Sequence, residues 1–220
     1  MRYPSGMRHD RSGNGAPLRV AVNTLSVVPL RTGGGETYLV NLLRHLAREP
    51  GVRLLLLAST ANESLFRDLP PETTEVRLVP MTGRSVPLRL ALEHVLVPAM
   101  ASRWGADVLF APGNAVPLLG SLPSVLAIQS MHYSIVPEQM DRFRVAYFKK
   151  LVPLSGRRAS RVVAVSEDIA RRLAEVAHLG PHRIRVVYEG FDPRFARWED
   201  EAKVEEVLAR HGVARPFLLF

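Results

Sequence analysis

The sequence contains no cysteine. A disulfide scaffold, a catalytic thiol and a cysteine-ligated metal site are therefore excluded. It also lacks any run of roughly 18 apolar residues, the length that a membrane-spanning helix needs. Near the start, Arg2, Arg8 and Arg11 are not followed by the apolar run of a signal peptide, because the next apolar segment begins at Leu18. We therefore expect a cytoplasmic protein.

Lysine is scarce, although the chain is basic. Of the 29 basic residues only Lys149, Lys150 and Lys203 are lysines, and the formal net charge is +8. Arginine binds phosphate and carboxylate well, so this excess favours anionic partners such as nucleotides or phospholipids. An arginine-rich composition that serves solubility alone would give the same excess. The arginines are scattered and not interleaved with aromatic residues, so we do not expect nucleic-acid binding.

Short apolar runs alternate with amphipathic segments along the 220 residues. We expect strands at residues 18–23, 52–58, 75–80, 107–111, 124–129, 161–165 and 184–188. We expect helices at residues 36–49, 85–104, 138–159, 166–177 and 200–211. Because the strands are apolar on both faces, the pattern predicts an α/β fold with a doubly wound, mostly parallel, Rossmann-like sheet.

The ends of the chain differ from its middle in composition. Residues 1–16 are rich in glycine, serine, arginine and asparagine, and we expect a flexible tail there. Residues 17–198 are predicted to form one Rossmann-like domain. Residues 199–220 are predicted to be a linker helix followed by the apolar strand 216–220. That strand either returns to the edge of the same sheet or opens a second domain, and we expect the second.

The first candidate site is the glycine turn Gly33-Gly34-Gly35 between the first strand and the first helix. Glycines allow a ligand to approach the backbone closely, and a helix N-terminus attracts anions. No lysine followed by serine or threonine completes a P-loop, and Tyr38 stands where a dinucleotide-binding motif needs a small residue. The turn is therefore either an anion site of another kind or a packing turn, and a nicotinamide-dependent oxidoreductase is not expected.

Further polar residues follow or end predicted strands and would meet at the carboxyl edge of the sheet, where open α/β sheets bind ligands. These residues are Asn23, Gln129, His132, Tyr133, Ser166 and Glu189. His132 has the chemistry of a base or of a hydrogen-bond partner for a hydroxyl group. Each also has a simpler explanation: a structural histidine for His132, a helix cap for Ser166 and a loop for Glu189.

Four segments together resemble the N-terminal half of a retaining glycosyltransferase of the GT-B fold, family 4. They are residues 32–46, 123–132, 161–173 and 183–192. The more specific part of the resemblance has two features. Ser166 opens a helix directly after a strand, and Gly190 and Asp192 follow the next strand. Tyr133 and Glu189 depart from the family pattern, which has aspartate and asparagine at these places.

The resemblance implies two Rossmann-like domains that face each other across a cleft. It implies that Gly33, Gly34 and Gly35 approach the donor phosphate, and that His132 lines the cleft near the reacting sugar. We also place Asn23, Gln129, Tyr133, Ser166 and Glu189 on the acceptor side or along the cleft. The family's donor-binding basic pair and paired glutamates would lie beyond Phe220.

The function implied by the resemblance is hexosyltransferase-like transfer from a nucleotide sugar to a glycan or lipid-linked acceptor, such as a cell-envelope polysaccharide. The nucleotide sugar is a co-substrate, and no metal or other cofactor is implied. These 220 residues alone are expected to be inactive, because the donor motifs are not among them. The alternative is a non-catalytic binding or partner module that keeps the fold.

One predicted helix has features of a membrane-binding surface. Residues 84–104 combine basic residues with an apolar stripe, namely Arg84, Arg89 and Arg103 beside Leu88, Leu92, Val95, Leu96 and Met100. A basic amphipathic helix can lie on anionic lipid, which would place the protein peripherally at the inner face of the membrane. Alternatively, the stripe packs on the sheet, as the helices of this fold do.

Overall fold

A computed structural model describes residues 15–29, 33–80, 86–190 and 200–217, without the side chains of 86–89. The chain divides into two compact units, Met1–Tyr188 and Glu189–Phe220. Because the described ranges begin at residue 15 and end at residue 217, the expected tail at 1–16 and the expected strand at 216–220 lie largely outside them.

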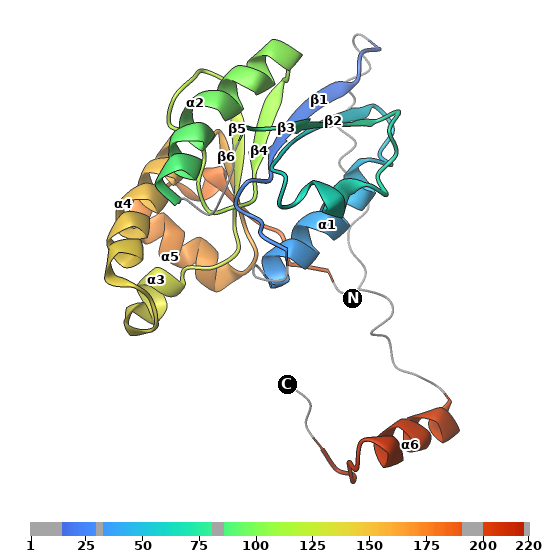
Figure 1. Ribbon diagram of the computed structural model, residues 1–220. Coiled ribbons are helices and arrows are strands. Elements are labelled where there is room, and N and C mark those ends of the chain that lie inside the picture. The colour runs from blue at the N-terminus through green and yellow to red at the C-terminus, as the bar shows by residue number, and fades with distance from the viewer. Residues whose placement is uncertain (1–14, 30–32, 81–85, 191–199, 218–220) are drawn as a thin grey trace. The chain divides into compact units, whose positions relative to one another are not determined.

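The first unit is built on a sheet in which every described strand pair is parallel (Figure 1). Its strands are β1 (Leu18–Asn23), β2 (Val52–Ala58), β3 (Thr74–Leu78), β4 (Val108–Ala111), β5 (Ser124–Ile128), β6 (Arg161–Ala164) and β7 (Ile184–Val186). The strand order is β3-β2-β1-β4-β5-β6-β7. The chain thus begins in the middle of the sheet and builds outward in both directions, which confirms the doubly wound, Rossmann-like fold.

Helices connect the strands. They are α1 (Gly34–Leu46), α2 (Val86–Trp104), α3 (His132–Ile135), α4 (Arg142–Arg158) and α5 (Glu167–Ala177). Short 3₁₀ turns occur at η1 (Glu63–Phe66), η2 (Pro137–Gln139) and η3 (Pro181–Arg183). The sequence pattern predicted the longer helices but not α3 or the 3₁₀ turns, because segments of three or four residues carry no helical periodicity.

The four consecutive leucines of β2 show how the helices cover both faces of the sheet. Leu54, Leu55, Leu56 and Leu57 are all 0% exposed. Leu54 and Leu56 pack in a cluster with Leu39 and Leu43 of α1, whereas Leu55 and Leu57 pack with Val97 and Ala101 of α2. Successive side chains of a strand leave opposite faces, so a strand buried on both faces needs an uninterrupted apolar run.

The described part of the apolar stripe on α2 faces the protein. Leu92, Leu96 and Met100 pack against the core under α2, and only Val95 of this part is well exposed, at 55%. Arg84 and the side chains of Leu88 and Arg89 lie outside what the structure describes. The described part of the stripe, apart from Val95, therefore packs on the protein. No described helix is long and apolar enough to cross a membrane.

The second unit contains α6 (Glu201–Arg210), whose start is capped by Asp200. The Asp200 side chain accepts a hydrogen bond from the backbone N–H of Lys203 at 3.2 Å. Arg215 forms ion pairs of 3.0 Å with both Glu201 and Glu205. The helix predicted at 200–211 is thus present.

Candidate functional site at the carboxyl edge of the sheet

Strands β1 and β4 pair with each other in the centre of the sheet, and the direction of the strand order reverses between them. In open parallel sheets the loops that leave such neighbouring strands diverge to opposite faces, and the crevice between them is where ligands bind. The loop after β1 leads to the glycine turn, and the loop after β4 begins at Pro112. The candidate site is therefore the set of loops at this edge.

The glycine turn opens α1 at this edge. Gly33 is the N-cap residue, with φ 58° and ψ −124°, a conformation that a residue with a Cβ rarely adopts. Its carbonyl accepts hydrogen bonds from the N–H groups of Glu36 and Thr37. A Cβ added to Gly34 would meet no atom within 4 Å. Gly33 and Gly34 are both exposed at the start of the helix, where the helix dipole favours an anion. Thr32 lies outside the described residues.

His132 is exposed and begins α3. Its Nδ1 lies 2.8 Å from the hydroxyl oxygen of Ser130, and its backbone N–H donates to the same oxygen at 3.2 Å. The Ser130 hydroxyl therefore fixes the orientation of the ring and leaves Nε2 for another partner.

Tyr133, the next residue, points the other way. It is only 5% exposed and belongs to the core cluster around β5 and β6. Its ring stacks on Phe148 with a centroid separation of 6.0 Å. Burial raises the pKa of the Tyr133 hydroxyl to about 12, so the hydroxyl stays protonated at neutral pH. The structure places the Tyr133 side chain in the core, because the first turn of α3 sends consecutive side chains in different directions.

Three of the remaining predicted site residues, Asn23, Gln129 and Ser166, have structural partners. Asn23 is 5% exposed, and its Oδ1 accepts a hydrogen bond from the N–H of Leu25. Ser166 caps α5 by accepting from the N–H of Ile169 at 3.2 Å. The backbone N–H of Gln129 donates to the side-chain oxygen of Asn114. Glu189 belongs to the second unit and is exposed.

The sequence reasoning missed Asn62, which ties two loops of the edge together. Asn62 is 0% exposed. Its Nδ2 donates to the carbonyl oxygens of Thr24 and Val27, at 2.8 and 2.9 Å. Its Oδ1 accepts from the N–H of Ser59 at 2.9 Å and from the Ser59 hydroxyl at 3.3 Å. One side chain thus fixes the loop after β1 to the turn after β2.

Two further residues join the loop after β4 to its neighbours. A Cβ on Gly113 would lie 2.3 Å from the hydroxyl oxygen of Ser26, so only glycine allows this contact between the β4 and β1 loops. Asn114 has a left-handed backbone with φ 65°, and its Oδ1 accepts from the N–H of Gln129 at 3.1 Å. The available sequence signal was the Gly113-Asn114 pair shortly after the predicted strand 107–111, because both residue types favour turns.

The described residues contain no group of three histidine, aspartate or glutamate side chains that could hold a metal ion. The arrangement consists of a helix N-terminus at the exposed residues Gly33 and Gly34, an oriented histidine, and loops fixed by Asn62 and Asn114. Chemically, it can attract an anion and hydrogen-bond a hydroxyl group.

Comparison with known proteins finds a matching family and similar folds. Residues 32–195 match the family model of Glycosyltransferase Family 4. No curated protein matches the sequence. Among solved structures, HepE of Anabaena in complex with UDP-glucose is similar, with 19% identity, a TM-score of 0.57, and coverage of 91% of this chain and 51% of that one.

Two other solved structures are similar in the same way. A glycosyltransferase from Rickettsia africae has 14% identity and a TM-score of 0.54, with 91% of this chain and 51% of that one covered. A UDP-N-acetylglucosamine 2-epimerase from Rickettsia bellii has 11% identity and a TM-score of 0.52, with 90% and 52% covered. At such identities the likeness shows the fold alone. The chain spans about half the length of the structures it matches.

Proposed function

The chain belongs to glycosyltransferase family 4, and on that premise we propose that it forms the acceptor side of an enzyme that transfers a sugar from a nucleotide-sugar donor. The observation that carries the proposal is the family match over residues 32–195, which includes the carboxyl-edge loops of β4 to β7. The acceptor is a glycan or a lipid-linked saccharide. The donor nucleotide is held by a second, C-terminal domain across the cleft.

Two features of the edge have roles in this proposal. The open helix N-terminus at Gly33 and Gly34 contributes N–H groups to the donor diphosphate, whose charge grows as the sugar leaves. His132, oriented through Ser130, offers Nε2 to a hydroxyl of the sugar or of the acceptor. Gln129 lies on the same loop and contributes to the acceptor side.

A transfer assay tests this function. We expect the 220-residue chain alone to transfer no sugar from a panel of nucleotide sugars to glycan or lipid-linked acceptors. The same residues joined to the nucleotide-sugar-binding half of a family member, here termed the two-domain enzyme, should transfer sugar. Turnover by the 220 residues alone would contradict the proposal that donor binding needs a second domain. A well-folded two-domain enzyme without turnover would favour a non-catalytic module.

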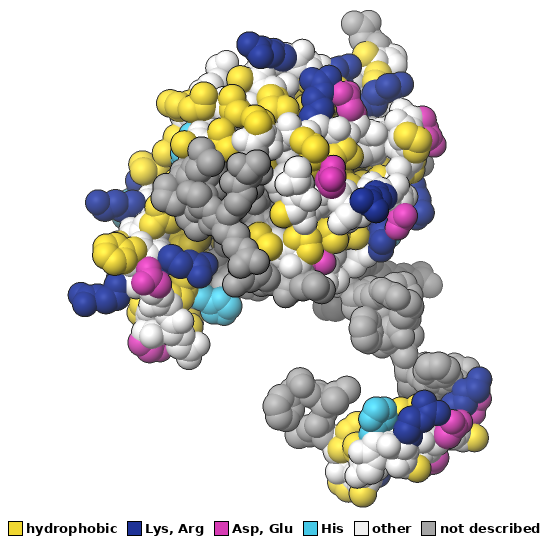
Figure 2. Space-filling model, in the orientation of Figure 1, with side chains coloured by type: hydrophobic (Ala, Val, Ile, Leu, Met, Phe, Trp, Pro, Cys, Tyr) yellow, Lys and Arg dark blue, Asp and Glu magenta, His cyan; other side chains and the backbone are white. Residues whose placement is uncertain are grey.

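We also propose that α4, not α2, provides the contact with an anionic membrane. The outer face of α4 carries Arg142, Lys149, Lys150 and Arg157, all exposed, and none forms an ion pair with a described residue. Phe143, 86% exposed, and Leu154, 45% exposed, lie on the same face. Figure 2 shows basic side chains and an exposed hydrophobic one together over α4. Acidic side chains occur only at its start, at Glu138 and Asp141.

Vesicle binding tests this surface. The chain should cosediment with vesicles that contain phosphatidylglycerol at low salt, and less at high salt, because each basic residue near such a surface contributes about 1 kcal/mol. Lys149→Gln combined with Lys150→Gln should therefore weaken binding about tenfold or more. Arg44→Gln with Arg48→Gln, an equal loss of exposed charge on and just after α1, is the control. Equal effects of the two pairs would mean that only net charge matters.

A further inference from the structure

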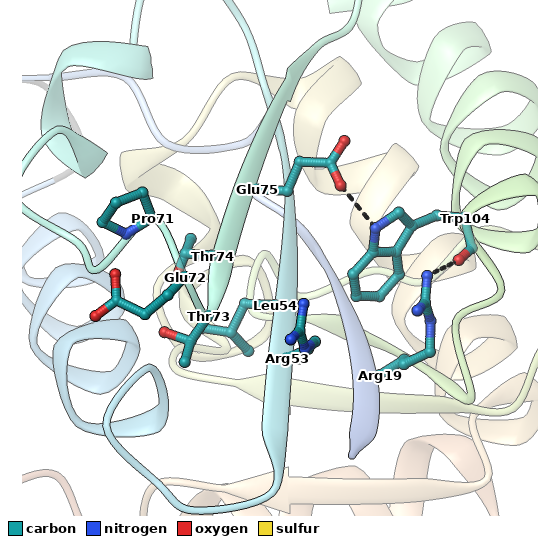
Figure 3. Close-up of a pocket in the computed structure, with 9 residues that line it drawn as sticks. All are labelled: Arg19, Arg53, Leu54, Pro71, Glu72, Thr73, Thr74, Glu75 and Trp104. Atoms are coloured by element: carbon teal, nitrogen blue, oxygen red, sulfur yellow. Dashed lines mark hydrogen bonds between the residues drawn. The ribbon is translucent and has the colours of Figure 1, made fainter. Parts of the chain in front are cut away.

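The two edges of the sheet differ in what they offer a ligand. At the amino ends of β1, β2 and β3 lies a hollow of about 480 Å³ (Figure 3). Arg19 lies over the Trp104 ring there, 4.1 Å from the ring centroid, and Glu75 accepts from Nε1 of Trp104 at 2.8 Å. Figure 3 shows the Glu72 carboxylate turned away from Arg53. These charged side chains bind within the protein or point apart, whereas the carboxyl edge holds a polar group in one fixed direction.

This polar group lies where β4 ends before its neighbour β5. Ala111, the last residue of β4, is opposite Leu126, and β5 continues to Ile128. The carbonyl of Ile128 accepts from the N–H of Val165, on the β6 side. Backbone groups of successive strand residues point alternately to the two neighbouring strands. The N–H of Gln129 therefore points to the β4 side, beyond the last residue of that strand.

Asn114, in the loop after β4, supplies the partner that the ended strand lacks. Its Oδ1 accepts from the backbone N–H of Gln129 at 3.1 Å. Because a backbone N–H can only donate, the side-chain atom that faces it is the oxygen, and this settles which way the amide points. Nδ2 is accessible to solvent and forms no hydrogen bond within the part of the chain that the structure describes. The side chain thus leaves the two N–H donors of Nδ2 open at this edge.

The backbone around Asn114 is held from both sides. Gly113, before it, packs against Ser26, since a Cβ on Gly113 would lie 2.3 Å from the Ser26 hydroxyl oxygen. Val116, after it, is 1% exposed, and its N–H donates to the Ser155 hydroxyl oxygen at 3.3 Å. The amide is therefore held in place before a ligand arrives, which lowers the entropic cost of a hydrogen bond with it.

We propose that Asn114 is a specificity-determining residue of the acceptor side, and that its Nδ2 donates to a hydroxyl oxygen of the acceptor saccharide. This inference rests on the proposed function, which places the acceptor at Gln129, the residue that Asn114 binds. A neutral amide suits a hydroxyl oxygen, because neither group brings a charge that needs a partner. A site built to bind a hydroxyl group rejects the analogue that lacks it, since the protein donor is then left unpaired. Asn114 thus selects among saccharides by one hydroxyl group.

The side-chain amide of Asn114 makes this contact directly observable by NMR. Its signals in the isotope-labelled chain are assigned by their absence from Asn114→Asp, which keeps Oδ1 for Gln129. The unaltered chain is titrated with the methyl glycosides of glucose, galactose, mannose and N-acetylglucosamine, and with inorganic phosphate. We expect a saturable shift of the Asn114 signals with at least one glycoside, while those of Asn41, half-buried on α1, stay in place. The proposal is overturned if no glycoside shifts the Asn114 signals, or if phosphate shifts them equally.

Matched asparagine variants test the assignment through affinity. Glycine adopts the φ of 65° at position 114 without strain, so Asn114→Gly removes the side chain and keeps the turn. It should weaken binding of the active glycoside about fivefold or more, whereas Asn41→Ala should leave binding unchanged. Deoxy analogues of that glycoside identify the hydroxyl group: loss of the contacted one should weaken binding to the parent but not to Asn114→Gly. If every deoxy analogue loses as much affinity for Asn114→Gly as for the parent, Asn114 only holds the loop and the proposal is overturned.

Failure of this inference and failure of the proposed function give different results. A two-domain enzyme without turnover contradicts sugar transfer, and the titration of the 220-residue chain still decides whether Asn114 contacts a saccharide. A two-domain enzyme that transfers sugar, and in which Asn114→Gly leaves the KM for the acceptor at the parent value, contradicts the role of Asn114 alone. The expected result is turnover in both forms, with the KM for the acceptor raised about fivefold or more in Asn114→Gly.

Discussion

Replacing Asn62 with alanine is expected to lower the free energy of unfolding by about 2–4 kcal/mol, because it removes a buried side chain with four hydrogen bonds. The Val27 carbonyl and the Ser59 N–H would both lose their partner in a buried environment. Denaturant unfolding of the 220-residue chain measures the change. In a domain of this size, the melting temperature should fall by roughly 5–15 °C.

Ser59→Ala is the matched control for this variant. It removes one buried hydroxyl and the 3.3 Å bond to Asn62, while the stronger backbone bond from the Ser59 N–H remains. Its cost should be about 1 kcal/mol or less. If Asn62→Ala lowers the free energy of unfolding no more than Ser59→Ala does, backbone hydrogen bonds hold the loops after β1 and β2, and the Asn62 side chain does not.

Much of the sheet could be predicted from the sequence because its central strands are largely buried on both faces. The valine and leucine runs of β1 and β2 were predicted with their observed bounds, Leu18–Asn23 and Val52–Ala58. The ends of weaker elements were not. The helix expected at 36–49 begins at Gly34, because the left-handed backbone of Gly33 starts it earlier than the apolar spacing indicates.

The candidate site could be predicted only in outline. Position after a strand indicates which loops share an edge, but not where each side chain points. His132 and Tyr133 are neighbours, yet one is exposed and the other lies in the core. Asn62 and Gly113 act through contacts with residues far away in the sequence, at Thr24 and Ser26. Such contacts have no local pattern, and they appear only when the strands are assembled.

The glycine turn offers a test in which ligand approach is separated from folding. A side chain at Gly33 would be strained, because its φ of 58° and ψ of −124° suit glycine alone. At Gly34, by contrast, an added Cβ would meet nothing within 4 Å, and the residue is exposed. We therefore expect the fold to tolerate a larger side chain at Gly34, which would stand beside the helix N-terminus where we place the donor phosphate.

In the two-domain enzyme, Gly34→Val is expected to lower turnover of the nucleotide sugar by roughly 100-fold, the usual cost of losing N–H groups that stabilise a developing negative charge. Gly34→Ala should give a smaller loss, because one methyl group blocks less of the approach. Unfolding of both variants should match the parent or improve slightly, since helix propensity rises when glycine is replaced. Gly33→Ala is the contrasting control, and it should lower stability by about 1–2 kcal/mol through backbone strain. Unchanged turnover in Gly34→Val, with stability intact, would show that the turn only serves packing and that the donor phosphate lies elsewhere.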